Sequence, residues 1–248
     1  MNPLPTYLEY LRLKYVSDNY EPLAKQASEK RWPHADYLQC LLEGEYHRRQ
    51  ERALERRVLA ARFPVLKTLD RFRWDWPTKI NEMQVKNLFR LGFVDKNTNV
   101  IFVGGCGLGK THLSVALGYQ ACQGGHSVLF TTAVDALNNL VAAQAAHRLK
   151  AELKKYLSPR ILHLDELGYL PLDKMGADLL FQVISQRYER GSIVITTNKP
   201  FKRWPEIFNN DAGITSAILD RLLHGAETVV IEGKSFRMKD QVDPPPSS

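Results

Sequence analysis

The sequence of 248 residues lacks the marks of several protein classes. Its three cysteines, Cys40, Cys106 and Cys122, show no CxxC spacing, which argues against a disulfide framework or a zinc site. No apolar run approaches the length of a membrane span, and no signal-peptide segment follows the N-terminus. There is no repeat at the periods typical of solenoids. We therefore expect a cytoplasmic protein without a membrane partner.

The charge balance favours an anionic partner. The 34 lysine and arginine residues outnumber the 27 acidic residues, which gives a formal charge of +7 and a pI of about 9.3. A nucleotide alone needs far less basic surface, so the surplus points toward a polyanion. The length is sufficient for a full α/β domain and a smaller second unit.

A glycine-rich run, IFVGGCGLGKT, extends from Ile101 to Thr111. An apolar strand precedes it and a helical pattern follows, which is the context of a phosphate-binding loop and disfavours a chance glycine-rich turn. Backbone N–H groups would surround the phosphates, with Lys110 reaching the β- and γ-phosphates and Thr111 binding Mg²⁺. The predicted nucleotide contacts are Gly104, Gly105, Cys106, Gly107, Leu108, Gly109, Lys110, Thr111 and His112.

A second motif, ILHLDE, begins at Ile161 and ends in Asp165 and Glu166. It reads as a buried strand that delivers two carboxylates to a ligand crevice. Asp165 would hold Mg²⁺ and Glu166 would orient and deprotonate the attacking water. An apolar run before Asp-Glu is common by itself, but it is informative downstream of a phosphate loop. Glu166 favours hydrolysis over phosphoryl transfer to a second substrate.

The order of elements indicates an α/β fold behind a small helical unit. Helical spacing dominates residues 1–64, and a domain boundary is expected near residue 65. Apolar strand candidates then alternate with helices through residues 65–240, which predicts a parallel sheet flanked by helices. The predicted strands cover residues 100–104, 127–132, 161–165, 193–198 and 228–232. The last residues, 241–248, are expected to form a disordered tail.

Two further residues are candidates for the reaction. Asn198 ends a predicted strand and would hydrogen-bond the γ-phosphate or the attacking water; the alternative is an ordinary strand-end cap. Arg221 lies in an apolar helical stretch and would complete the active site of a neighbouring subunit. The alternative for Arg221 is a surface arginine or a partner of Asp220.

One basic cluster lies in the helix predicted over residues 34–62. Its members recur at helical spacing and are Arg48, Arg49, Arg52 and Arg56. One interpretation is a solvated face balanced by Glu51 and Glu55. The other, which we favour slightly beside a nucleotide site and a basic pI, is contact with nucleic acid.

The motifs in order resemble the IstB family of insertion-sequence helper ATPases, which are AAA+ proteins close to DnaC and DnaA. The resemblance rests on KTLDxF from Lys67, the phosphate loop with His112, LDELGYLP from Leu164, TTN from Thr196 and DRL from Asp220. It covers nearly the whole chain. It implies Lys110 and Thr111 as Walker A residues, Asp165 and Glu166 as Walker B, Asn198 as sensor 1 and Arg221 as the arginine finger.

The resemblance also implies how the protein works. Its relatives form ATP-dependent homo-oligomers on duplex DNA, with the ATP site between subunits; they deform the target and recruit and stimulate a transposase. Adenine would lie near residues 69–72. An inserted element, about residues 134–158, would face DNA with Arg148, Lys150, Lys154 and Lys155, although a solvated helix face is the alternative. Gly105 and Cys106 replace prolines common in the family, and Arg237 is a weak candidate for sensor 2.

The sequence is compatible with three functions. The first is a transposition regulator that assembles on DNA and is released by ATP hydrolysis. The second is a replicative helicase loader with the same ATPase and a different partner. The third is a scaffold in which ATP acts only as an assembly switch, although the adjacent Asp165 and Glu166 argue against it.

Overall fold

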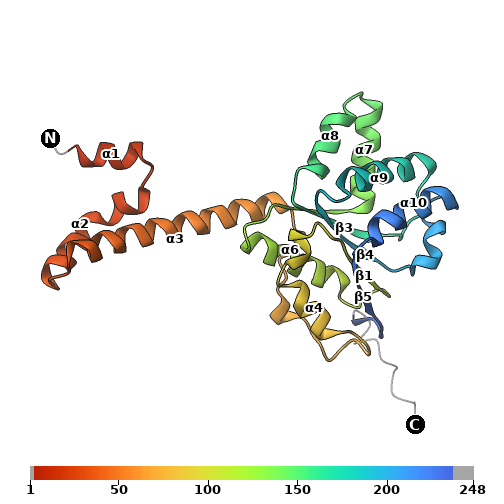
Figure 1. Cartoon of the computed structure of the whole chain (residues 1–248), viewed down its shortest axis with the longest axis horizontal. Coiled ribbons are helices and arrows are strands. Elements are labelled where there is room, and N and C mark those ends of the chain that lie inside the picture. The colour runs from red at the N-terminus through yellow and green to blue at the C-terminus, as the bar shows by residue number, and fades with distance from the viewer. Residues whose placement is uncertain (1–2, 237–248) are drawn as a thin grey trace, which may run out of the picture. The chain divides into compact units, whose positions relative to one another are not determined.

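The computed structural model describes residues 3–236, which form two compact units divided between Arg56 and Arg57 (Figure 1). The division falls earlier than the boundary expected near residue 65, because the last turns of helix α3 (His34–Ala61) belong with the second unit. There Arg57 Nε donates a hydrogen bond to the carbonyl of Cys122 at 2.8 Å, and Ala61 is fully buried. The tail expected at 241–248 and the sensor 2 candidate Arg237 lie outside the described residues.

The first unit is helical, as predicted. It contains α1 (Leu4–Tyr10), α2 (Lys14–Glu29) and the greater part of α3. Its small core packs Leu8, Val16 and Leu41 together.

The second unit contains a parallel sheet of five strands in the order β2-β3-β4-β1-β5. The strands are β1 (Val100–Gly104), β2 (Val128–Thr132), β3 (Ile161–Leu167), β4 (Ser192–Thr197) and β5 (Glu227–Ile231). All five predicted strands are confirmed, although β3 runs beyond Asp165. The central strands are nearly continuous in apolar residues because helices cover both faces of the sheet.

Helix α6 (Lys110–Gln123) covers one face of the sheet, and the other face carries a larger group of helices (Figure 1). That group comprises α7 (Ala133–Ala145), α8 (Leu149–Leu157), α9 (Lys174–Arg187) and α10 (Ala212–Leu223). Short 3₁₀ turns cover Leu69–Arg71 and Phe201–Glu206. The inserted element expected over 134–158 is therefore the pair α7 and α8.

The apolar pattern of residues 80–91 predicts a single helix, but the helix in the structure is shorter. Helix α4 (Glu82–Leu88) begins after Asn81, whose side chain accepts a hydrogen bond from the Gln84 N–H and caps the helix. The chain turns at Leu91, which has φ of 63°, and starts a new short helix, α5 (Gly92–Asp95). The apolar spacing continues across this turn, and so the sequence pattern alone predicts one longer helix.

Among residues 3–236, no helix is long and apolar enough to cross a membrane. The sheet instead defines where a ligand binds. The carboxyl ends of parallel strands share one edge, and ligands of such sheets bind in the crevice outside that edge. The loops after β1, β3 and β4 all leave from it.

Candidate active site

The loop between β1 and α6 requires glycine at several positions. Gly107 and Gly109 have φ of 71° and 88°, in the left-handed region. A Cβ on Gly109 would lie 2.6 Å from Cε2 of Phe72, and one on Gly104 would clash with the carbonyl of Ile231. The predicted phosphate loop is therefore a tightly held turn that leads into the N-terminus of a helix.

Lys110 and Thr111 begin helix α6 at this loop. Lys110 is buried, and its Nζ donates a hydrogen bond to the carbonyl of Gly105 at 2.6 Å. The Thr111 hydroxyl lies 3.1 Å from each carboxylate oxygen of Asp165 on β3. The structure thus brings together the two residues that the sequence assigned to Mg²⁺. Their hydroxyl and carboxylate oxygens fit that ion, which prefers oxygen ligands and keeps several waters.

Asp165 is buried at the end of the strand and also accepts a hydrogen bond of 2.5 Å from the hydroxyl of Thr196 on β4. Burial raises the pKa of Asp165 above its usual value, and the hydrogen bonds from Thr196 and Thr111 and the charge of Lys110 partly oppose that rise. A nearby cation would favour the ionised carboxylate further.

Glu166 occupies an unusual backbone position. Its φ is 61°, and the pairing of β3 with β4 shifts register between Leu164 and Leu167. The Glu166 N–H donates to the Thr196 hydroxyl at 2.9 Å, which fixes this bulge. Left-handed non-glycine residues cost on the order of 1–3 kcal/mol and are concentrated at functional sites. The bulge places Glu166 in the wall of the same cavity as the phosphate loop.

That cavity has a volume of about 550 Å³. The phosphate-loop residues Gly107 to His112 form one wall, and the connector before the sheet, including Arg71 and Phe72, forms another. His112 Nε2 lies 2.8 Å from the Thr68 carbonyl, and the rings of His112 and Phe72 pack edge to face at 5.5 Å. Two of the connector residues expected near adenine therefore line the cavity. Gly104, Gly105 and Cys106 precede this wall.

Asn198 and Arg221 lie on different elements, the first after β4 and the second on α10. Asn198 follows β4, and its Oδ1 is buried with no hydrogen-bond partner in the described part of the chain. Arg221, on α10, donates to the carbonyl of Ala217 at 2.9 Å and lies over the ring of Phe181 at 5.0 Å. Arg221 is not among the residues that line the phosphate cavity of its own chain.

The four arginines of α3 divide into two pairs. Arg48 forms an ion pair with Asp18 at 3.1 Å, and Arg49 forms one with Glu45 at 2.9 Å. Arg52 and Arg56 are exposed. Half of this cluster therefore already neutralises carboxylates of its own unit.

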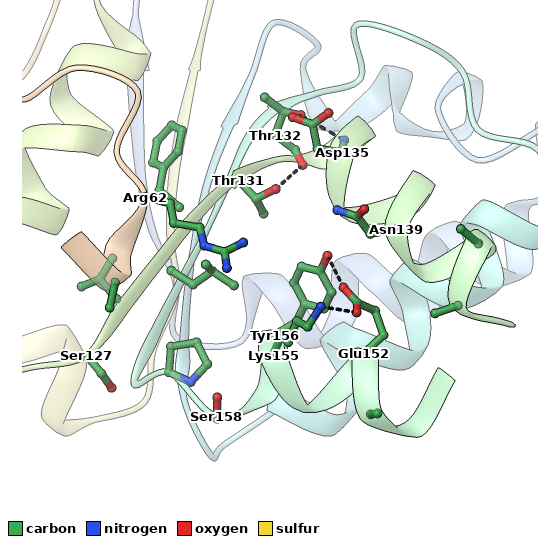
Figure 2. Close-up of a pocket in the computed structure, with 18 of the residues that line it drawn as sticks. Arg62, Ser127, Thr131, Thr132, Asp135, Asn139, Glu152, Lys155, Tyr156 and Ser158 are labelled. Atoms are coloured by element: carbon green, nitrogen blue, oxygen red, sulfur yellow. Dashed lines mark hydrogen bonds and ion pairs between the residues drawn. The ribbon is translucent and has the colours of Figure 1, made fainter. Parts of the chain in front are cut away.

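Lys155 on α8 and Arg148, which precedes this helix, line a second, larger cavity of about 1000 Å³ (Figure 2). Strand β2, helices α7 and α8 and the chain near Arg62 line it. All four basic residues are exposed, and Lys155 is paired with Glu152 at 2.5 Å. The sequence did not predict this cavity, because segments distant along the chain form its walls.

Sequence reasoning also missed a role for Thr196. Its hydroxyl bonds both Asp165 and the N–H of Glu166, so it connects the two acids. The signal was present in the motif TTN, which was assigned only through Asn198. Tyr169 was also missed; it lines the phosphate cavity, and its hydroxyl lies 3.5 Å from Sγ of Cys106.

Comparison with known proteins agrees with this geometry. The family model of IstB-like ATP binding proteins matches residues 6–243. The chain is 39% identical over 241 residues to an insertion sequence IS21 ATP-binding protein of Pseudomonas aeruginosa, covering 97% of this chain and 91% of the relative. It is 34% identical over 235 residues to an insertion sequence IS5376 ATP-binding protein of Geobacillus stearothermophilus, covering 95% and 93%.

Solved structures share the fold of the second unit. The DnaC helicase loader matches with a TM-score of 0.54 and 25% identity, over 66% of this chain and 96% of that one. AMPPCP-bound DnaA from Aquifex aeolicus matches with a TM-score of 0.58 and 20% identity, over 72% and 54%. The sheet, the phosphate loop and these likenesses define an AAA+ P-loop ATPase. Because the family model spans nearly the whole sequence, the chain belongs to the family of IstB-like ATP binding proteins.

Proposed function

We propose that this ATPase is a regulator of transposition that oligomerises on target duplex DNA in the cytoplasm, deforms the DNA and recruits and stimulates a transposase. ATP hydrolysis then drives its release. Two relatives that align over at least 95% of the chain are ATP-binding proteins of insertion sequences, which supports this role. The surplus of basic residues supports a DNA partner.

The observation that carries the catalytic part is the hydrogen-bonded series Thr111–Asp165–Thr196–Glu166. In the proposal, Lys110 and the loop N–H groups hold the phosphates, and Thr111 and Asp165 hold Mg²⁺, which would neutralise charge on them. Glu166 orients the attacking water and accepts its proton. Asn198 is not among the residues that line the cavity, but its Oδ1, which has no hydrogen-bond partner among residues 3–236, would accept a hydrogen bond from that water.

Arg221 would act on a neighbouring subunit. Within its own chain it lies on α10 outside the phosphate cavity. An arginine supplied in trans stabilises charge on the transferring phosphoryl group. Hydrolysis would therefore depend on assembly of the homo-oligomer.

Lys150, Lys154 and Lys155 on α8, and Arg148 just before it, would contact DNA phosphates without reading sequence. Of these, Lys155 contributes least in the proposal, because it already pairs with Glu152. Many phosphate contacts would offset the cost of bending a 20 to 30 base-pair site, roughly 1–6 kcal/mol. In the proposal the second unit, which begins at Arg57 rather than at the expected residue 65, is the ATPase domain. The first unit, with exposed Arg52 and Arg56, would form the surface for DNA or transposase.

A helicase loader is the second candidate, since DnaC matches the ATPase unit over 96% of its own length. The two functions differ in their DNA. A transposition regulator prefers duplex DNA, whereas a loader prefers single strands and a replicative helicase. Fluorescence anisotropy with duplex and single-stranded oligonucleotides, with and without ATP, separates them. We expect ATP-dependent binding that is tighter on the duplex.

The same assay tests the DNA surface. Replacing Lys150 and Lys154 with alanine removes two proposed phosphate contacts, so the slope of log K against log salt on duplex DNA should become shallower by about 2. Lys86→Ala on α4, where Lys86 pairs with Glu82, is the control and leaves the slope unchanged. Stronger binding to single strands, together with capture of a helicase and not of the transposase, would favour the loader.

A further inference from the structure

The turn that follows Glu166 reaches across to the phosphate loop. The N–H of Tyr169 donates to the Glu166 carbonyl at 3.4 Å, which closes a tight turn. The hydroxyl of Tyr169 lies 3.5 Å from Sγ of Cys106 in the phosphate loop. One side chain therefore extends from the turn that carries the proposed base to the loop that would hold the phosphates.

Other contacts hold this turn in the fold. Gly168, its third residue, has φ of 92°, and a Cβ there would lie 2.7 Å from Cδ1 of Ile207. The Leu172 N–H donates to the Ile207 carbonyl at 2.8 Å, and the Glu166 N–H donates to the hydroxyl of Thr196. These contacts fix the turn to β4 and to the chain that follows it. The contact of the tyrosine with the phosphate loop differs from them, because that loop is the element that a nucleotide would occupy.

The side chains of Tyr169 and Cys106 lie at the surface of the cavity and not in the core. Tyr169 lines the cavity and is 40% exposed, and Cys106 is exposed. A phenolic hydroxyl donates or accepts a hydrogen bond, and a thiol does either weakly. Loss of this contact should therefore affect the reaction more than the stability of the fold.

We propose that Tyr169 is a positioning residue for ATP hydrolysis, which holds the Glu166 turn against the phosphate loop through Cys106. A general base must lie within hydrogen-bond reach of its proton, and a small displacement lowers the rate steeply. Phosphates bound in the loop would fix Cys106 and, through Tyr169, the distance from Glu166 to the γ-phosphate. The inference rests on the proposed role of Glu166 as the base, and it is independent of the DNA and transposase roles.

Tyr169→Phe tests the contact because it removes only the hydroxyl. We expect kcat for ATP hydrolysis to fall about three- to tenfold, which is the effect of losing one hydrogen bond. The ATP dissociation constant, measured by isothermal titration calorimetry, should change by less than about twofold, because Lys110, Thr111 and the loop N–H groups remain. Tyr119→Phe, on α6 and not among the residues that line the cavity, is the matched control and leaves kcat unchanged.

A double-mutant cycle tests whether the two side chains act through each other. Cys106→Ala should lower kcat as much as Tyr169→Phe, and the double variant should be no slower than either. Cys106→Ser keeps a donor and an acceptor, so its kcat should be several-fold higher than that of Cys106→Ala. Losses that multiply in the double variant would overturn the proposal. An ATP affinity that weakens in proportion to kcat would also overturn it, because Tyr169 would then be a nucleotide contact.

Glu166→Gln distinguishes failure of the positioning role from failure of the base. If Glu166 is the base, this variant is nearly inactive, and adding Tyr169→Phe lowers its residual rate no further. Normal turnover by Glu166→Gln would contradict the base and, with it, the inference. An inactive Glu166→Gln variant beside a Tyr169→Phe variant with the wild-type kcat would overturn the positioning role alone.

Discussion

The buried carboxylate of Asp165, proposed to hold Mg²⁺, lowers the stability of the ligand-free fold when it is charged. Its pKa is raised because burial disfavours the charged carboxylate. In the absence of ligand, the stability associated with its protonated form is present at low pH and is lost as the pH rises through the raised pKa. A neutral side chain at this position avoids that loss, but it no longer attracts a cation.

Asp165→Asn should therefore raise the thermal midpoint of the ligand-free protein at pH 7 to 8 and reduce ATP hydrolysis by at least about 100-fold. Differential scanning calorimetry across pH checks the first effect. The gain should shrink toward pH 4, near the ordinary pKa of an aspartate, about 3.9, because both side chains then become neutral. A lower midpoint at neutral pH would show that the hydrogen bonds of the carboxylate outweigh its burial.

Thr196 connects the two acids, and its hydroxyl is the only atom that changes character in Thr196→Val. The substitution removes the donor to Asp165 and the acceptor for the Glu166 N–H. Because the bulge at Glu166 loses its support, we expect the rate of ATP hydrolysis to fall about tenfold to 100-fold. The ATP dissociation constant should stay nearly unchanged. Steady-state phosphate release and equilibrium ATP binding separate these effects.

The adjacent residue supplies the matched control. Thr197 is also fully buried, but its hydroxyl accepts a hydrogen bond from the Lys199 N–H, away from the two acids. Thr197→Val should destabilise the fold by about 1 kcal/mol and leave hydrolysis near the wild-type rate. Equal loss of activity in both variants would reduce Thr196 to a general packing role.

Among the secondary-structure elements, the end of α8 is fixed by a residue from another helix. Arg187 on α9 is 2% exposed, and burial with the nearby charge of Arg160 lowers its pKa to about 10. Its guanidinium donates to backbone carbonyls of Tyr156, Leu157, Pro159, Arg160 and Ser192. The first two carbonyls belong to the last turn of α8, where a positive charge complements the helix dipole.

Replacing Arg187 with methionine leaves these carbonyls without their donor. We expect a loss of about 3 kcal/mol in the free energy of unfolding, measured by urea titration. Arg190→Met, at an exposed position three residues later, should change it by less than about 0.5 kcal/mol. A small effect at Arg187 would mean that water replaces the guanidinium.

The sequence was most informative where local pattern and structure coincide. The five strands and the phosphate loop were predictable, because buried parallel strands are apolar throughout and a phosphate loop needs glycine at fixed positions. The bulge at Glu166 was not, since a hydroxyl from β4 supports it. Likewise Trp76 and Phe236 are far apart in sequence and meet only in the folded chain. Contacts of this kind leave no periodic signal.

At the scale of the whole molecule, the proposed function divides the active site between two subunits. Arg221→Ala should abolish most hydrolysis while retaining ATP binding, because the proposed arginine acts on a neighbour. Mixing it with Glu166→Gln should restore partial activity, since the first variant supplies an intact Glu166 and the second an intact Arg221. Phosphate release from each variant and from the mixture checks this. A mixture as inactive as its components would place Arg221 outside the shared site.

In the proposed function, ATP hydrolysis that depends on Glu166 ends a DNA-bound state. Glu166→Gln keeps the size of the side chain and removes the carboxylate that would accept the proton of water. The direct measurement is the rate at which the variant dissociates from duplex DNA in the presence of ATP. A single-turnover experiment with competitor DNA gives this rate. We expect release from DNA at least about tenfold slower than for the wild type, with ATP binding retained. Normal turnover with release at the wild-type rate would contradict it.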